Sequence, residues 1–399
     1  MKNKSFAKLL ITTFLTTGLT MVSSFLLARL LAVEERGALQ LFITSVTYVV
    51  TIATGGVGFS LALCMRNNQY HYWRYYFSTF LLFSVLVSSL SLLLFNITSF
   101  HYLFILNVVL TAIFTITLEK SKIDANLSIY RLLSLQQPIL AVGLYGGYYF
   151  LFGEQHLEKV VQLLTILTCI QALFALYALS KIEKQFKQKA EIKSIVPNYF
   201  FKNWLKQNLL QTFGATTVNL DRFLIVALMG NYTLGLYTVC IAFDALLTRI
   251  INMLVDYYYS GLLNNLNRIR AVLGLILLMG ISAVIIVPFL AEPVINLFFG
   301  NAYIEVAPVL LWFIINSLLA GLSWLLSQNM LILGKQVLLF TRQIISILVL
   351  VGLFFAFKNQ GLYGVAYALI GASLVRLMIS FIYYYKFPIK TKTNLSWIK

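Results

Sequence analysis

Long apolar stretches, separated by short polar loops, run through almost the whole chain. A membrane-spanning helix needs about 20 mainly apolar residues, and twelve stretches approach or exceed that length. The predicted spans cover residues 8–31, 38–64, 75–95, 101–118, 132–152, 160–179, 205–230, 233–263, 271–291, 305–333, 336–357 and 362–385. The pattern therefore predicts an all-α polytopic membrane protein with about 12 transmembrane helices.

One charged stretch, residues 181–203, interrupts the apolar pattern and is long enough to be a linker. It predicts an N-terminal six-helix lobe over 1–180, a basic cytoplasmic linker over 181–203, and a C-terminal six-helix lobe with a cytoplasmic tail over 204–399. Because six is even, both lobes enter the membrane in the same direction. A parallel repeat about an axis along the membrane normal is therefore expected.

The two predicted lobes also match in their polar positions when the first is shifted by 198 residues. Polar residues in the first two spans recur every three or four positions and so share one helical face. Their counterparts in the second lobe include Gln211, Arg222, Arg249, Asn252 and Asp256. The match predicts that corresponding faces of the two lobes line a shared central cavity.

The charge distribution indicates topology rather than a nucleic-acid partner. The net charge is +17, although only 11% of residues are charged and 60% are hydrophobic. Loops on alternate sides hold nearly all Lys and Arg, including Lys120, whereas the opposite loops clearly hold only Arg36, Lys159 and Lys358. This bias predicts that both termini are cytoplasmic. The Lys-rich opening segment is interpreted as a retained first helix.

Seven ionisable residues lie inside predicted spans, where charge is costly and usually functional. They are Asp221, Arg222, Asp244, Arg249, Asp256, Arg342 and Arg376. We expect them to face a hydrated cavity or one another. Three alternatives stay open: that Arg342 and Arg376 extend to the interface from helix ends, that Asp221 and Arg222 only satisfy neighbouring helices, and that Asp244 caps a polar group of another helix.

These positions define the predicted site. The predicted substrate-binding residues are Arg222, Arg249, Asn219, Asn252, Gln211 and Thr51. The residues predicted to position charge or carry a coupled ion are Asp221, Asp256 and Asp244. We predict no catalytic residue, metal site or cofactor.

Three segments resemble Wzx-type polysaccharide flippases of the multidrug/oligosaccharidyl-lipid/polysaccharide exporter superfamily. They are ARLL at 28–31 with ERG at 35–37, DRFLI at 221–225 with Gly230 and GLY at 235–237, and LFFGNAY at 297–303 with PVL at 308–310. The resemblance covers nearly the whole chain in helix number and order. Asn301 and Ala302 depart from it, because the family often has an acidic residue there, which leaves the role of that loop open.

The resemblance implies two six-helix lobes around a central cavity in a MATE-like fold. It also implies a flippase that moves an undecaprenyl-pyrophosphate-linked oligosaccharide to the outer leaflet of the bacterial cytoplasmic membrane, for surface polysaccharides such as O-antigen or capsule. Arg222 and Arg249 would contact the headgroup, and Asp221 and Asp256 would position them or carry a proton. The implied partners are the glycan lipid, the bilayer, a polysaccharide polymerase and a chain-length regulator.

Two other classes compete with this interpretation. A cation-coupled small-molecule or drug antiporter of the same superfamily would share the fold, although the excess of Arg over Asp inside the spans disfavours a cationic substrate. A membrane-embedded polysaccharide polymerase or ligase would be expected to place catalytic residues on a large outer loop. The predicted outer loops are short and poor in His and Arg.

Overall fold

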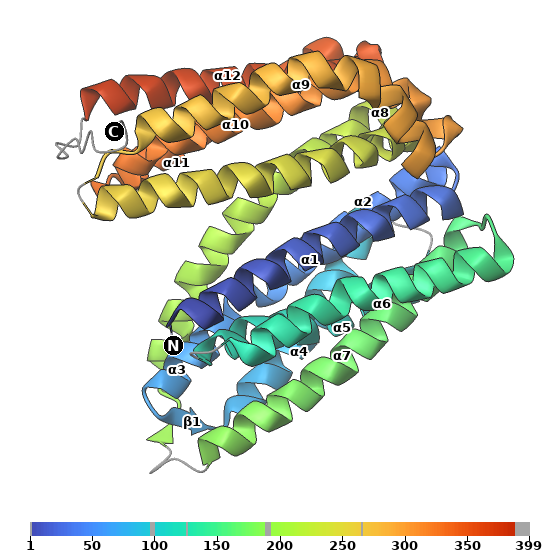
Figure 1. The fold of residues 1–399 in the computed structure, drawn as a ribbon. Coiled ribbons are helices and arrows are strands. Elements are labelled where there is room, and N and C mark those ends of the chain that lie inside the picture. Colours follow the sequence, from blue (N-terminus) through green and yellow to red (C-terminus); the bar gives the residue numbers. More distant parts are fainter. Residues whose placement is uncertain (1, 96–99, 125–126, 188–192, 265, 388–399) are drawn as a thin grey trace. The chain divides into compact units, whose positions relative to one another are not determined.

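The computed structural model describes residues 2–95, 100–124, 127–187, 193–264 and 266–387, which are almost entirely helical (Figure 1). The first helices are α1 (Lys2–Leu30), α2 (Val33–Thr54), α3 (Val57–Arg66), α4 (Trp73–Phe95), α5 (His101–Lys120), α6 (Ser128–Phe152) and α7 (Leu157–Lys187). They are followed by α8 (Pro197–Leu263), α9 (Ile269–Phe298), α10 (Ala307–Ile332), α11 (Gln336–Phe357) and α12 (Gly361–Lys386). Short 3₁₀ turns are η1 (Ser121–Ile123), η2 (Asn301–Val306) and η3 (Lys358–Gln360). Every predicted span is helical, which confirms the all-α fold class.

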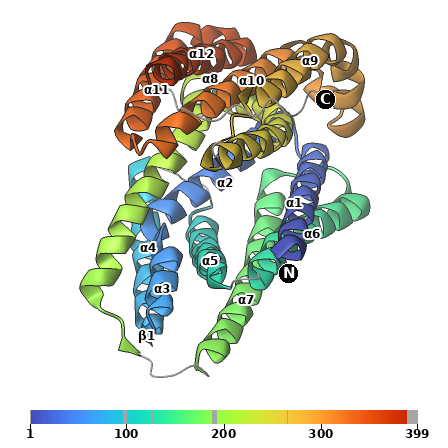
Figure 2. The same cartoon turned by 60° about the vertical axis from the view of Figure 1, so that its left-hand side comes forward.

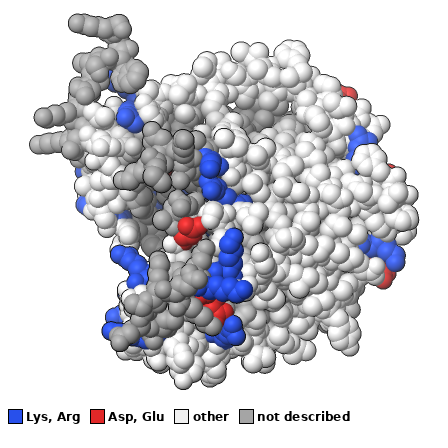
Figure 3. Space-filling model, turned by 60° about the horizontal axis from the view of Figure 1, so that its bottom comes forward, with Lys and Arg blue, Asp and Glu red and all other residues white. Residues whose placement is uncertain are grey.

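The helices have the length and surface of a multi-pass membrane protein. Among the described residues, nine helical segments, some of which join two or more of these elements, are long and apolar enough to cross a membrane. Helix α9 exposes large apolar side chains along its length, among them Leu278, Ile281, Ile285 and Phe289. Contiguous apolar surface of this kind marks contact with lipid or protein. On the face shown in Figure 3, Lys and Arg gather in one area, while a broad area carries no charge.

Two glycines break the apolar helices. Gly56 has a φ of 78° and separates α2 from α3, so the span predicted over 38–64 is divided in two. Gly230 has φ 87° and ψ 175° inside α8, at the boundary between the spans predicted over 205–230 and 233–263. Residues with a side chain rarely adopt either conformation. The chain direction therefore changes at both positions.

The helices form two compact units, Met1–Phe223 and Leu224–Lys399. In the first unit, α1 packs on α6, α5 packs on α7, and α2 packs on α4 and α5 (Figure 2). In the second unit, α12 packs on α10 and α11, and α10 packs on α9. The contacts of residues 204–223 thus join them to the first unit, although the sequence assigned them to the second lobe.

The division into six and six helices, with its repeat, stays a prediction. Residues 188–192 of the predicted linker and the predicted tail from 388 lie outside the described residues.

The start of α8 is attached to the first unit by a strand pair and an aromatic cluster. β1 (Gln69–His71) pairs in parallel with β2 (Lys193–Ser194), just before α8 begins. On α8, Phe200 is fully buried, and Trp204 lies 5.0 Å from Phe80 of α4 between ring centroids. Aromatic pairs at such distances contribute beyond their buried area. These contacts explain why the first part of α8 belongs with α1–α7.

Two basic residues predicted for loops are buried instead. Lys120, at the end of α5, is fully buried, with its Nζ 3.0 Å from the Tyr70 hydroxyl and 3.5 Å from the Trp73 ring centroid. Burial raises the pKa of the Tyr70 phenol well above its usual range. Arg36 lies in the first turn of α2 and donates to Ser24 Oγ of α1 at 2.9 Å. Both side chains are buried in contacts with neighbouring segments of the fold. The assignment of Lys120 and Arg36 to loops was therefore wrong.

Candidate functional site

The break between α2 and α3 brings three helices close together. A Cβ on Gly58 would lie 2.3 Å from the Ile116 carbonyl oxygen and 2.7 Å from Glu119 Cβ, both on α5. A Cβ on Gly55 would lie 2.9 Å from Gln211 Oε1 of α8. Side chains cannot be accommodated at such distances without movement. Gly55 and Gly58 therefore mark positions of close helix packing.

Asn208 of α8 satisfies the backbone that this break exposes. Its Nδ2 lies within hydrogen-bond distance of the carbonyl oxygens of Thr51, Ile52 and Gly55, at 3.2, 3.0 and 3.1 Å. The last carbonyls of a helix have no partner within the helix, and inside a membrane such groups must be satisfied by the protein. Asn208 thus fastens α8 to the end of α2.

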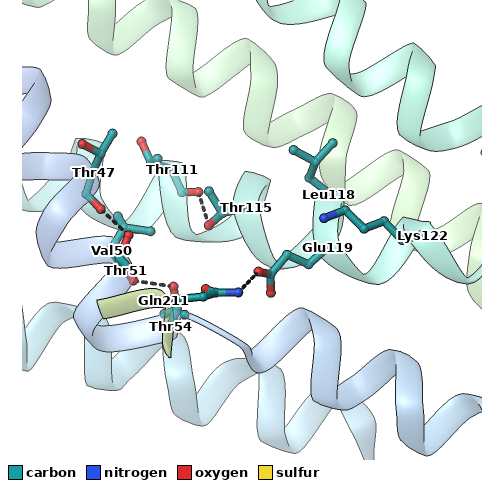
Figure 4. Close-up of a pocket in the computed structure, with 11 residues that line it drawn as sticks. Thr47, Val50, Thr51, Thr54, Thr111, Thr115, Leu118, Glu119, Lys122 and Gln211 are labelled. Carbon is teal, nitrogen blue, oxygen red and sulfur yellow. Dashed lines mark hydrogen bonds between the residues drawn. The ribbon is translucent and has the colours of Figure 1, made fainter. Parts of the chain in front are cut away.

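A pocket lies beside this junction, entirely within the first unit (Figure 4). Its volume is about 300 Å³, at the lower end of the range for ligand sites. The lining residues come from α2, α5, η1, α8 and the turn at Gly55: Thr47, Val50, Thr51, Thr54, Gly55, Thr111, Thr115, Leu118, Glu119, Lys122 and Gln211. It contains two of the predicted site residues, Thr51 and Gln211.

Glu119 is the carboxylate of this pocket. Gln211 Nε2 donates to Glu119 Oε1 at 2.6 Å, and the Phe59 backbone N–H donates to Oε2 at 3.3 Å. Figure 4 shows Glu119 and Gln211 pointing toward each other. The carboxylate therefore joins α5 to both α3 and α8.

Sequence reasoning missed Glu119, because the predicted span ended at residue 118. A signal was nevertheless present. Asn107, Thr111, Thr115 and Glu119 are spaced by four residues and lie along one side of α5. A polar stripe of this kind on an apolar helix predicts a face that avoids lipid, and Glu119 continues it by one turn.

The threonines give the pocket an excess of hydrogen-bond acceptors. Thr51 Oγ1 donates to the Thr47 carbonyl at 2.8 Å, and Thr54 Oγ1 donates to the Val50 carbonyl at 2.9 Å. On α5, Thr115 Oγ1 donates to the Thr111 carbonyl at 2.9 Å. A hydroxyl whose hydrogen is used in this way keeps its lone pairs as acceptors. Together with Glu119, these groups suit a ligand rich in O–H or N–H donors.

A second polar group lies further along α8. Arg222 Nη1 donates to Asn219 Oδ1 at 3.0 Å and to Thr44 Oγ1 of α2 at 3.4 Å. Its Nε is buried and has no hydrogen-bond partner among the described residues. The Asp221 carboxylate accepts the Arg222 backbone N–H at 2.8 Å. Three predicted site residues are thus neighbours here.

Gln211 and Arg222 lie on the same face of α8. They are separated by 11 positions, which is about three turns and roughly 16 Å along the helix. Gln211 lies beside Gly55 at the end of α2, and Arg222 donates to Thr44 of α2. The face of α8 that lies along α2 therefore carries the pocket at one end and an arginine at the other.

The second unit holds a separate polar cluster around Asp244. Its carboxylate accepts from Ser317 Oγ of α10 and, at 3.4 Å, from Thr248 Oγ1. A cavity of about 150 Å³ adjoins it, with Asn252 and Trp324 among the lining residues. The contact with α10 agrees with the alternative in which Asp244 serves a neighbouring helix. Asn252 borders this cavity, and its predicted part in substrate binding stays a prediction.

Arg249 and Asp256 are exposed on α8, and among the described residues no hydrogen bond or ion pair holds either side chain. Their predicted part in substrate contact or coupling stays a prediction.

Arg342 is buried instead, since it is only 5% exposed and its side chain donates hydrogen bonds inside the second unit. Its guanidinium is held between Ser323 of α10 and Ser380 of α12. No group of three or more His, Cys, Asp or Glu among the described residues is placed to hold a metal ion.

Comparison with known proteins identifies the fold. No protein-family model matches the chain, and no curated protein matches it by sequence. An inward-facing structure of a multidrug resistance MATE family transporter of the MOP superfamily is similar, with a TM-score of 0.69 and 13% identity over 96% of this chain and 97% of the other. An outward-facing structure of such a transporter has a TM-score of 0.56 and 12% identity over 96% and 95% of the two chains.

A mutant of the Vibrio cholerae MATE transporter VcmN has a TM-score of 0.51 and 13% identity over 96% and 97%. These similarities confirm a MATE-like fold. The narrower resemblance to Wzx-type flippases stays a prediction.

Proposed function

We propose that this chain is a membrane transporter that flips a lipid-linked oligosaccharide, with pyrophosphate between lipid and sugars, across the bacterial cytoplasmic membrane. The observation that carries the proposal is the face of α8 on which Gln211 borders a hydroxyl-rich pocket and Arg222 lies about three turns away. A substrate that carries an oligosaccharide on its phosphates needs a hydroxyl-binding region and a phosphate-binding group on one surface.

Each part of this face suits one part of the substrate. Sugar hydroxyls are donors, and the pocket offers the lone pairs of Thr51 and Thr115 and the carboxylate of Glu119. The Arg222 guanidinium has a buried Nε–H without a partner among the described residues, and arginine binds phosphate oxygens with two parallel N–H groups. The lipid tail can stay in the bilayer while the polar headgroup crosses.

The proposed mechanism is alternating access, as in other transporters built from two bundles. Glu119 joins α5, α3 and α8 through its two oxygens. We therefore assign it a place beside Asp221, Asp256 and Asp244 among the carboxylates that couple transport to an ion gradient. Sugar binding at Gln211 would compete with the Glu119 contact, so that the substrate itself loosens the attachment of α8.

The rival function is a cation-coupled antiporter of small molecules. It is favoured by one observation, namely that an acceptor-rich pocket with a carboxylate also suits an organic cation. The solved structures of similar fold include multidrug resistance transporters. Two positive charges disfavour a cationic substrate: Lys122 lines the same pocket, and Arg222 lies on the same face of α8 as Gln211.

Two substrates in the same proteoliposomes separate these functions. One is a fluorescent polyprenyl-pyrophosphate oligosaccharide, whose leaflet is read from quenching by an impermeant reductant. The other is ethidium, loaded inside and driven by a proton or sodium gradient. Faster exchange of the glycan lipid than in protein-free vesicles, without ethidium efflux, supports the proposal. Ethidium efflux without glycan exchange supports the antiporter.

A further inference from the structure

Two arginines face each other across the α11–α12 pair of the second unit. Ser346 Oγ of α11 donates to the Ala372 carbonyl of α12 at 3.0 Å. Arg342 precedes Ser346 by four residues, and Arg376 follows Ala372 by four. In an antiparallel pair these positions come to the same level. Ser380 joins them directly, since its Oγ accepts from Arg342 Nη1 at 2.8 Å and donates to the Arg376 carbonyl at 2.8 Å.

The described residues supply no carboxylate that pairs with either of these two charges. Among the described residues, neither Arg342 nor Arg376 forms an ion pair. The other partners of Arg342 are the carbonyl and hydroxyl oxygens of Ser323 of α10, both at 3.2 Å. The Nε of each arginine is buried and has no hydrogen-bond partner among the described residues. Burying an unpaired charge is strongly unfavourable, so an anion bound between two like charges at one level would stabilise them.

The site is close to helix ends that are themselves basic. Arg342 lies six residues after the start of α11, about 9 Å along the helix. Lys335 directly precedes α11, and Lys386 is the last residue of α12. Arg376 lies ten residues before the end of α12, about 15 Å along the helix, so the two arginines lie about two and three turns from these basic helix ends.

The surroundings favour a lipid as the source of the anion. On the outer faces of α11 and α12, Ile344, Met378 and Ile382 are 48%, 66% and 58% exposed. Both helices therefore border lipid near the level of the two arginines. Basic pockets between transmembrane helices bind anionic lipid headgroups.

We infer that Arg342 and Arg376 form a phosphate-binding site between α10, α11 and α12, occupied by the headgroup of an anionic membrane lipid. Two planar guanidinium groups provide parallel N–H donors for phosphate oxygens, and the site lies apart from the pocket at Glu119. The inference does not depend on the proposed transport function.

The test uses the purified full chain in neutral detergent, with thermal unfolding followed by tryptophan fluorescence. Phosphatidylglycerol, phosphatidylcholine or inorganic phosphate is added, and potassium chloride keeps the ionic strength equal. We expect phosphatidylglycerol, and not phosphatidylcholine, to raise the midpoint by several degrees. Native mass spectrometry should show bound phosphatidylglycerol on the wild type.

Three variants connect the effect to the site. Arg342→Gln and Arg376→Gln should bind phosphatidylglycerol about tenfold more weakly, as expected for loss of a charge-assisted hydrogen bond. Arg270→Gln, an exposed arginine at the start of α9, should bind like the wild type. If Arg342→Gln does not fold, Arg376→Gln alone decides, because its side chain makes none of the hydrogen bonds to Ser323 and Ser380.

The outcomes are distinct. Stabilisation by both phosphatidylglycerol and inorganic phosphate, lost in the two variants, supports a phosphate site that a free ion also fills. Stabilisation by phosphatidylglycerol alone, lost in the same variants, supports the lipid as occupant. Stabilisation by inorganic phosphate alone overturns the lipid assignment. Equal binding by the wild type, Arg342→Gln and Arg376→Gln overturns the site altogether.

Discussion

Gln211 Nε2 lies 2.6 Å from Glu119 Oε1, which joins the first half of α8 to α5 inside the pocket of the first unit. The bond is short and its acceptor is a carboxylate, so it belongs to the stronger class of hydrogen bonds. In the proposed function, a substrate in the pocket would compete with this protein contact. Loss of this hydrogen bond should therefore affect both the stability of the first unit and the proposed transport cycle.

A double-mutant cycle measures this bond. We expect Glu119→Ala and Gln211→Ala each to lower the stability, and the double variant to be little worse than either one. The expected coupling energy is about 1–2 kcal/mol. The measurement is thermal or denaturant-induced unfolding of the purified protein in detergent.

The chain offers a matched control in Glu158 and Gln162, an exposed pair of the same residue types whose atoms are 3.4 Å apart. This pair should show no measurable coupling. Strictly additive effects at Glu119 and Gln211 would contradict a direct contact.

Gly58 is predicted to be intolerant of alanine. Its added Cβ would lie 2.3 Å from a backbone oxygen of α5, which cannot rotate away. Gly58→Ala should therefore destabilise the protein by about 1–3 kcal/mol and reduce transport. The control is Gly143→Ala in α6, where no heavy atom lies within 4 Å of the added Cβ. That variant should be neutral or slightly stabilised, since alanine favours helix. Similar loss in both variants would show that α3 and α5 are not closely packed.

Lys120 is predicted to act through packing as well as charge. Its Nζ lies 3.5 Å from the Trp73 ring centroid, and the side chain is fully buried. Lys120→Ala should be more destabilising than Lys120→Met by about 2 kcal/mol, because alanine leaves a cavity that methionine fills. Unfolding of the exposed-site variant Lys181→Ala serves as the reference. Equal effects of the two Lys120 variants would indicate that α5 moves to close the space.

The two predicted headgroup arginines should differ in their effects on stability. Arg222 bonds to Asn219 and Thr44, so Arg222→Gln should lower both stability and transport. Arg249 is exposed and has no hydrogen-bond or ion-pair partner among the described residues. Arg249→Gln should therefore unfold like the wild type and still transport roughly tenfold more slowly, as a lost arginine–phosphate contact implies. Wild-type transport by Arg249→Gln would remove this residue from the substrate path.

The fold was predictable from the sequence because the apolar runs have the length that a bilayer demands. Even the bend at Gly230 falls between two predicted spans. The break at Gly56 was not predicted, since the apolar pattern continues across it. Only the approach of α5 and α8 explains why the helix must end there.

The site was predicted in part. Thr51 and Gln211 line the pocket, and Arg222 lies beside Asn219 and Asp221. Glu119 was not predicted as a site residue because the hydropathy criterion ends a span at the first charged residue. The criterion does so even where that charge has a partner inside the protein. Lys120 and Arg36 were assigned to loops for the same reason. Burial of a charge depends on tertiary contacts, and counting loop residues cannot detect it.

The most direct test of the central claim is to fill the pocket and measure flipping. Thr115→Phe introduces a ring into the pocket, whereas Leu106→Phe places the same ring on α5 at an exposed position outside it. Both variants are compared with the wild type in proteoliposomes that contain a fluorescent polyprenyl-pyrophosphate oligosaccharide. The account predicts that the wild type and Leu106→Phe exchange the glycan lipid between leaflets and that folded Thr115→Phe does not. Exchange by Thr115→Phe at the wild-type rate would contradict it.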